Sequence, residues 1–198
     1  MNINQHLIFL APYETVATNT ATWFKGFCNL ALLILGIGIC LYTAVHGKYI
    51  AGGFATITLL VAHVANTEDQ FAEASVIILA GIVGGIAELI NTSFGIYEYN
   101  TSPFQFALLP TWIVSIWFVI GATVRCTFRW LAYRIITAGA MGAMLGSLTY
   151  FIASKLNVIS FTGSFENYEV ASSLAWSVAF PVIIVIGHRL FPMNSVGK

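Results

Sequence analysis

The sequence predicts an all-α integral membrane protein, a bundle of six transmembrane helices joined by short loops. Hydrophobic residues make up 58% of the 198 residues and charged residues only 8%, whereas about a quarter of the residues in an average soluble domain are charged. The mean hydropathy is +0.84. This composition indicates that a bilayer surrounds most of the chain.

The helices are expected in six apolar runs, each near the roughly 20 residues that cross a bilayer core, with all 198 residues in one transmembrane domain. The runs are residues 25–45, 49–66, 73–95, 106–125, 134–154 and 170–188. The first two must form an antiparallel hairpin, because only residues 46–48 separate them. An aromatic loop, residues 96–105, separates the third run from the fourth, and polar loops separate the second from the third and the fifth from the sixth.

Basic residues predict the orientation, since short cytoplasmic loops are enriched in Lys and Arg. The side of the bundle that carries the termini has six basic residues: Lys25, Arg125, Arg129, Arg134, Arg189 and Lys198. The opposite side has only Lys48 and Lys155. We therefore expect both termini in the cytoplasm and the protein in a cell membrane, typically a bacterial inner membrane. The N-terminal segment lacks a basic start and a small-residue cleavage site, so the first helix is expected to be retained.

Charge and motifs exclude several functions. Eight Lys and Arg balance eight Asp and Glu, and without a basic run or an RNA-binding motif we expect no nucleic-acid partner. The three cysteines and four histidines are scattered, without the spacing of a zinc, diiron or redox site. No nucleotide-binding motif is present. We therefore expect no metal and no cofactor.

The third helix carries an ionisable residue, Glu88, inside an apolar run. A charge there is costly, so intramembrane acids usually face a partner, a wet cavity or a substrate. Small and polar residues recur with Glu88 at three- and four-residue spacing, among them Gly81, Gly85 and Asn91. Helix five repeats this spacing at Gly142, Gly146 and Tyr150 among others, and we predict that helices three and five pack together.

Depth along the helices places a candidate site in the outer half of the bilayer. With a rise of 1.5 Å per residue, Glu88 and Tyr150 lie about two-thirds of the way across from the cytoplasmic side, and Trp112 and Trp176 lie about five residues from the outer ends. Glu88 would donate or accept a proton, oriented by Tyr150 and Asn91. The predicted substrate-binding residues are Trp112, Tyr97, Trp176, Gly85 and Gly146. Two alternatives stay open: the tryptophans as interfacial anchors, and Glu88 as a structural hydrogen-bonding group.

Arg125 and Arg129 stand one helical turn apart on the cytoplasmic side. Basic residues at this level can hold anionic lipid headgroups. They also serve as topology signals and snorkelling anchors, and the sequence leaves both readings open.

Four stretches carry a resemblance to a known family: GGIAELINTSFGI, LLPTWIVSIWFVIGATVRCTFRWL, GAMLGSLTYFIASKLNVISF and AWSVAFPVIIVIGHRLF. After Thr22 the chain resembles a bacterial family of small uncharacterised membrane proteins, classed only as a domain of unknown function. The residues that match its pattern are Glu88, Pro110, Trp112, Trp117 and Tyr150. The chain departs from it at Glu88, where the family more often has Asp, and at Arg125 and Cys126, in a stretch that is usually uncharged. Members are often encoded near lipid-methylating enzymes, so the resemblance implies lipid metabolism.

A second and more local resemblance concerns ELINTSFGIYEYNT followed by LPTWI. This pattern is similar to the carotenoid hydratases and their lycopene cyclase relatives, in which intramembrane acids protonate an isoprenoid double bond. It implies the same role for Glu88.

We therefore expect a protein that binds or modifies a lipid or isoprenoid-type substrate around Glu88. If it is an enzyme, it uses acid/base chemistry without a cofactor. The alternatives are a non-catalytic accessory or assembly subunit of a membrane complex and a small-solute transporter. The expected partners are membrane lipids, other membrane subunits or a second copy of the chain.

Overall fold

The computed structural model describes residues 20–100, 105–106, 109–163 and 165–191. These residues form six α-helices, one short 3₁₀ helix and four short strands. The helices are α1 (Thr20–Val45), α2 (Tyr49–Ala65), α3 (Gln70–Ser93), α4 (Thr111–Val124), η3 (Arg129–Leu131), α5 (Ile135–Lys155) and α6 (Phe165–Leu190). The strands are β1 (Tyr97–Tyr99), β2 (Gln105–Phe106), β3 (Leu109–Pro110) and β4 (Ile159–Phe161).

Four helices are long and apolar enough to cross a membrane: α1, α3, α5 and α6. α2 and α4 are apolar too, but have only 17 and 14 residues. Large apolar side chains cover much of the exterior, for example Ile34, Phe54 and Ile82, as expected for a surface that faces lipid. The structure therefore supports a helical bundle of the membrane type, whereas six crossings and cytoplasmic termini stay predictions.

Local chemistry sets the helix ends that differ from the prediction. α3 begins at Gln70 and not at residue 73, because the Asp69 side chain caps it by accepting a hydrogen bond from the Ala72 amide at 3.1 Å. The predicted start of helix four at residue 106 is wrong. β2 and β3 pair there as an antiparallel ladder, and the extended Pro110 (φ −61°, ψ 140°) precedes the first turn of α4.

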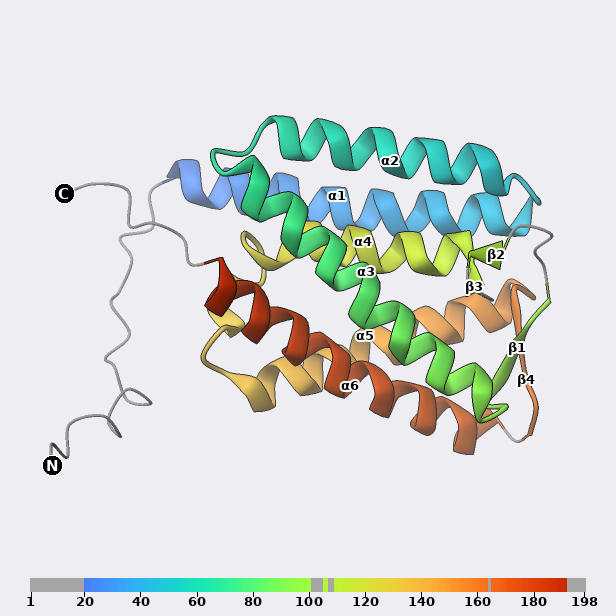
Figure 1. The fold of residues 1–198 in the computed structure, drawn as a ribbon. Helices are drawn as coiled ribbons and strands as arrows, with labels where there is room; N and C mark the ends of the chain where they lie inside the picture. Colours follow the sequence, from blue (N-terminus) through green and yellow to red (C-terminus); the bar gives the residue numbers. More distant parts are fainter. Residues whose placement is uncertain (1–19, 101–104, 107–108, 164, 192–198) are drawn as a thin grey trace, which may run out of the picture.

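α4 lies at the centre of the α1, α2 and α3 group and packs against all three. Most of α4 is buried, with no exposed surface left on Ile113, Ile116 or Trp117. Figure 1 shows α3 crossing the bundle diagonally between α4 and α6, while α5 crosses α6 and packs against it. The hairpin of α1 and α2 forms as predicted, turning at Gly47 with a positive φ of 66°.

The predicted packing of helices three and five against each other is wrong. α5 packs mainly on α6, and α3 packs on α4 and α6. Gly84 of α3 and Gly146 of α5 make room for large aromatic side chains instead of for each other's helix. A Cβ atom added to Gly84 would lie 1.9 Å from the Trp117 ring of α4, and one added to Gly146 would lie 2.7 Å from the Trp176 ring of α6.

Strands β1 and β4 form a small antiparallel sheet that the all-α prediction did not contain. Tyr97 pairs with Phe161 and Tyr99 pairs with Ile159, so the sheet ties the connection after α3 to the connection before α6. Side chains alternate across a strand, and accordingly Tyr97 is buried while Glu98 is exposed. We name the end of the bundle that carries β1 and β4 the sheet end, and the end that carries residues 125–134 the basic end.

Candidate functional site

Glu88 lies on α3 near the sheet end and has no exposed surface. Its Oε1 atom accepts hydrogen bonds from Trp117 Nε1 at 3.0 Å, Tyr150 OH at 2.8 Å and Trp176 Nε1 at 3.3 Å. Its Oε2 atom accepts from the hydroxyl groups of Tyr97, of Tyr99 at 3.0 Å and of Tyr150 at 2.9 Å. We name these donors the aromatic cage: Tyr97, Tyr99, Trp117, Tyr150 and Trp176.

Four elements build the cage: β1, α4, α5 and α6. The rings also contact one another, with centroids 4.2 Å apart for Trp117 and Trp176 and 5.0 Å apart for Tyr97 and Tyr150. Trp176 Nε1 also donates to Tyr150 OH at 3.0 Å. Aromatic pairs at these distances add stability beyond the area that they bury, so the ring contacts join α4 to α6 and β1 to α5 in addition to the hydrogen bonds to Glu88.

Every member of the cage is neutral and brings a hydrogen-bond donor. Burial, and after it the charge of Glu88, holds the pKa of the Tyr97 and Tyr99 phenols well above its ordinary value. Both phenols of β1 therefore keep their protons at neutral pH and can donate to the carboxyl group. A carboxylate can accept about four hydrogen bonds, and the cage supplies donors for all of them. Among the described residues, no cation is hydrogen-bonded to Glu88.

The structure brings three of the predicted partners to Glu88, namely Tyr97, Tyr150 and Trp176. Asn91 is buried one turn further along α3, but its Nδ2 atom donates to none of the described residues. The orienting bond that we expected from Asn91 to Glu88 is thus not formed.

The other predicted substrate-binding residues surround the cage. Trp112 is buried with its ring centroid 5.8 Å from that of Tyr99. Gly146 lies directly against the Trp176 side chain, whereas Gly85 has free space, since the nearest atom to an added Cβ would be Leu109 Cδ1 at 4.0 Å.

Sequence reasoning did not assign Tyr99 and Trp117 to the site. The alternation Tyr97-Glu98-Tyr99 is a strand pattern that places both tyrosines on one face, but the segment reads as a loop because it is so short. Trp117 stands five residues after Trp112 on α4. Its place beside Glu88 depends on Gly84, whose missing side chain admits the indole.

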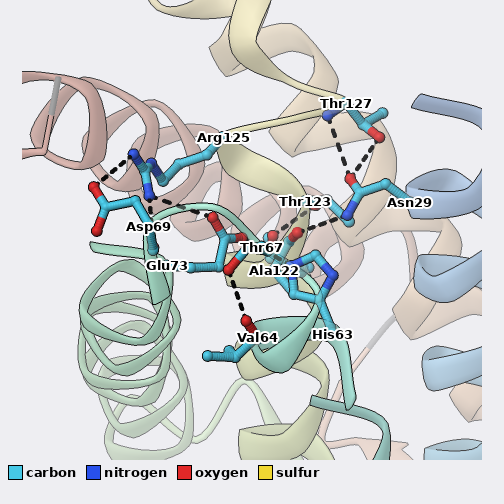
Figure 2. A network of polar contacts seen from close by, with 11 residues as sticks. Asn29, His63, Val64, Thr67, Asp69, Glu73, Ala122, Thr123, Arg125 and Thr127 are labelled. Carbon is cyan, nitrogen blue, oxygen red and sulfur yellow. Dashed lines mark hydrogen bonds and ion pairs between the residues drawn. The ribbon is translucent and has the colours of Figure 1, made fainter. Parts of the chain in front are cut away.

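A second group of polar side chains, the ionic cluster of His63, Asp69, Glu73 and Arg125, lies at the basic end. Figure 2 shows the Arg125 guanidinium group reaching toward Asp69 and Glu73, at 3.5 Å from an oxygen of each carboxylate. His63 Nε2 lies 2.9 Å from the other Glu73 oxygen. Arg125 is only 7% exposed. Its guanidinium group, which we predicted to hold a lipid headgroup, contacts two carboxylates instead. Arg129, the second predicted headgroup ligand, is exposed.

Neutral hydrogen bonds fix the same end of α4 to α1. Asn29 Nδ2 donates to the Ala122 carbonyl oxygen at 2.8 Å, and its Oδ1 atom accepts from Thr127 Oγ1 at 2.7 Å. The basic end is therefore held by side chains of α1, α2, α3 and the segment that follows α4.

Within the described ranges, no group of three or more His, Cys, Asp or Glu side chains is placed to hold a metal ion. The pair of His63 and Glu73 lacks a third ligand of this kind and contacts Arg125 instead.

Comparison with family models matches residues 27–182 to a family described as "Protein of unknown function (DUF2878)". Neither a curated protein nor a solved structure matches the chain. The first family resemblance is confirmed, and the more local one to carotenoid hydratases stays a prediction.

Proposed function

We propose that the chain, which belongs to this family of unknown function, binds or modifies a lipid or isoprenoid-type substrate in the membrane. In this proposal Glu88 is the proton donor or acceptor. The observation that carries the proposal is a buried carboxyl group held by five neutral aromatic donors. The apolar exterior of the bundle suits a protein that meets such a substrate in the surrounding lipid.

The neutral surroundings of Glu88 favour proton transfer. A carboxyl group paired with Arg or Lys must break an ion pair before it takes up a proton, whereas Glu88 has only hydroxyl and indole groups to rearrange. Tyr150 OH contacts both carboxyl oxygens and lies 3.1 Å from Tyr97 OH. This chain of hydroxyl groups can pass a proton between the carboxyl group and β1.

Access to Glu88 runs through the sheet end. The rings of the cage occupy the space next to the carboxyl group, so a substrate has to displace at least one of them. Tyr97 and Tyr99 are carried by a three-residue strand, while the other members stand on long helices. Movement of β1 with β4 would therefore expose Glu88 at the lowest cost in helix packing.

Replacement of Glu88 by Gln tests the proposal, with Glu98→Gln as the matched control. Both residues are glutamates at the sheet end, but Glu98 is exposed and lies outside the cage. Glu88→Gln should change the profile of membrane lipids and pigments in cells that produce the protein, because an amide cannot donate or accept the proton. Glu98→Gln should leave the profile unchanged. An unchanged profile with Glu88→Gln at normal protein level would exclude the acid/base role.

A non-catalytic role as an accessory or assembly subunit has one observation in its favour: both oxygens of Glu88 are satisfied and fully buried. In that case Glu88 serves only to fix α3 to the helices around it. Glu88→Gln would then lower the thermal stability or the recovery of a complex on size-exclusion chromatography, with an unchanged lipid profile.

A further inference from the structure

The described carboxylates of the basic end are already paired with basic side chains other than Arg129. Lys25 Nζ lies 3.4 Å from Glu68 Oε1. The Arg125 guanidinium group contacts the other two carboxylates, which belong to the ionic cluster (Figure 2). Arg129 takes part in none of the ion pairs between described residues. Its exposed guanidinium group therefore carries a positive charge that no carboxylate of the described chain balances.

A hydrogen-bonded turn presents Arg129 at the surface together with a second arginine. We name residues 129–134 the basic turn. Its backbone is fixed by hydrogen bonds from Leu131 N to Phe128 O and from Arg134 N to Leu131 O, each 2.9 Å long. The Leu131 side chain is completely buried, and the Phe128 ring contacts a phenylalanine ring of α6 with centroids 5.1 Å apart. These two contacts anchor the turn on the bundle, while its arginines stay exposed.

Trp130 connects the two arginines of the basic turn. It follows Arg129 directly, and the Arg134 guanidinium carbon lies 5.7 Å from the centre of its ring. The indole is 44% exposed and therefore accessible from outside the bundle. A guanidinium group can donate two parallel hydrogen bonds to a phosphate group. Two guanidinium groups beside one indole therefore suit a phosphate, which also supplies a negative charge opposite Arg129.

The surface that adjoins the basic turn is apolar. Ile135 and Ile136 begin α5 directly after the turn and are 55% and 90% exposed, and Tyr133 within the turn is 96% exposed. Basic and aromatic side chains beside exposed aliphatic ones are typical of the headgroup level of a membrane. A soluble phosphate ester would leave the two isoleucines in contact with water, whereas the acyl chains of a phospholipid cover them.

We propose that the basic turn binds the headgroup of an anionic phospholipid, with Arg129 and Arg134 donating hydrogen bonds to its phosphodiester oxygens. Arg134 thus takes the place that the sequence analysis gave to Arg125. Trp130 contacts the glycerol region, and the acyl chains run along the start of α5. A zwitterionic lipid binds more weakly, because its own ammonium group competes with the arginines for the phosphate. The site lies at the opposite end of the bundle from Glu88, so the inference stands without the proposed function.

Native mass spectrometry of the full chain, purified in a neutral detergent, measures the binding. The protein is equilibrated with equal concentrations of phosphatidylglycerol and phosphatidylcholine that have the same acyl chains. The protein peaks that carry one molecule of either lipid are then compared. One basic residue near an anionic headgroup contributes about fivefold to binding. For two arginines we therefore expect about 30-fold more bound phosphatidylglycerol than phosphatidylcholine.

Substitution of the two arginines tests the site directly. Arg129→Gln and Arg134→Gln should each lower the preference for phosphatidylglycerol by about fivefold, and the double variant should remove it. The matched control is the double variant Lys48→Gln, Lys155→Gln. It removes the same number of positive charges from exposed positions at the sheet end, and it should keep the preference of the native chain.

Three outcomes would overturn the inference. The first is equal binding of the two lipids by the native chain. The second is an equal loss of preference in the two double variants, which would assign the binding to general electrostatic attraction. The third is displacement of phosphatidylglycerol by millimolar glycerol phosphate, which would make the ligand a soluble phosphate ester.

Thermal unfolding in detergent without added lipid identifies a folding defect in any variant. Arg129→Gln breaks no ion pair among the described residues, so its unfolding temperature should equal that of the native chain. A lower preference for phosphatidylglycerol in this variant, at an unchanged unfolding temperature, supports binding at the basic turn. An unchanged preference at the same stability contradicts it.

Discussion

Glu73 and Glu88 lie on the same buried face of α3, about 22 Å apart along the helix, and the structure compensates them in opposite ways. Glu73 contacts Arg125 and His63 and belongs to the ionic cluster. Glu88 contacts only neutral phenols and indoles. An ion pair resists the uptake of a proton, whereas a neutral cage can hold either protonation state with rearranged hydroxyl groups. The basic end therefore holds helices together through charges, whereas the sheet end has the neutral surroundings on which the proposed proton transfer depends.

The largest effect is expected at the basic end. Arg125→Ala leaves the buried Glu73 carboxylate without its guanidinium partner, and loss of one partner of a buried pair costs about 3–5 kcal/mol. The free energy of unfolding, measured by denaturant titration in detergent micelles, should fall by this amount. Arg129→Ala is the control and should change it by less than about 0.5 kcal/mol, because Arg129 is exposed. Equal losses for both variants would mean that the ionic cluster does not stabilise the fold.

Overpacking at the sheet end should have the next largest effect. Gly84→Ala places a Cβ 1.9 Å from the Trp117 ring, so the indole must move and lose its bond to Glu88. Such a substitution costs about 1–3 kcal/mol in unfolding free energy. Gly85→Ala is the neighbouring control, with free space around its Cβ. Tryptophan fluorescence, measured with all tryptophans of the native chain kept, should change in Gly84→Ala and stay unchanged in Gly85→Ala. An unchanged spectrum would contradict the close approach.

Alkaline pH should destabilise the sheet end. Tyr97 and Tyr99 have raised pKa values in the folded protein, so unfolding releases their protons above the ordinary tyrosine pKa of about 10. The stability that they contribute is present below that pH and is lost as the pH rises, by about 1.4 kcal/mol per pH unit for each tyrosine. Unfolding free energies between pH 8 and pH 11 should therefore fall more steeply for the native chain than for a Tyr97→Phe, Tyr99→Phe double variant. If the unfolding free energies of the native chain and of the double variant fell equally with pH, the two tyrosines would not be the cause of the loss of stability.

The smallest effect is expected from one cage donor. Tyr99→Phe removes a single hydrogen bond of 3.0 Å to Glu88, which is worth about 0.5–1.5 kcal/mol. Tyr133→Phe, at a tyrosine that is 96% exposed, should have no measurable effect on the same unfolding curve. A loss in Tyr99→Phe as large as that in Arg125→Ala would remove the distinction between the two ends.

Pattern and composition were sufficient for the class of protein and for the position of its acid. Long apolar runs predict membrane-type helices because backbone groups in lipid have to be satisfied within each segment. The small-residue face of α3 predicts that Glu88 points inward, and Glu88 is buried. Depth alone predicts that Tyr150 and Trp176 lie near it, since helices of similar length bring residues to comparable levels, whereas Tyr97 was predicted from the loop that follows helix three.

Tertiary structure decided which helices meet and which donors the acid receives. Spacing shows that a helix has a small-residue face, but not which ring fills the gap; Gly84 and Gly146 proved to admit Trp117 and Trp176 and not each other's helices. Tyr99 became a donor only because β1 pairs with β4, a contact between segments about sixty residues apart. The sequence by itself therefore determined the apolar helices and the buried carboxyl group, because these depend on local composition. Contacts between distant elements determined the neutral cage and the ionic cluster.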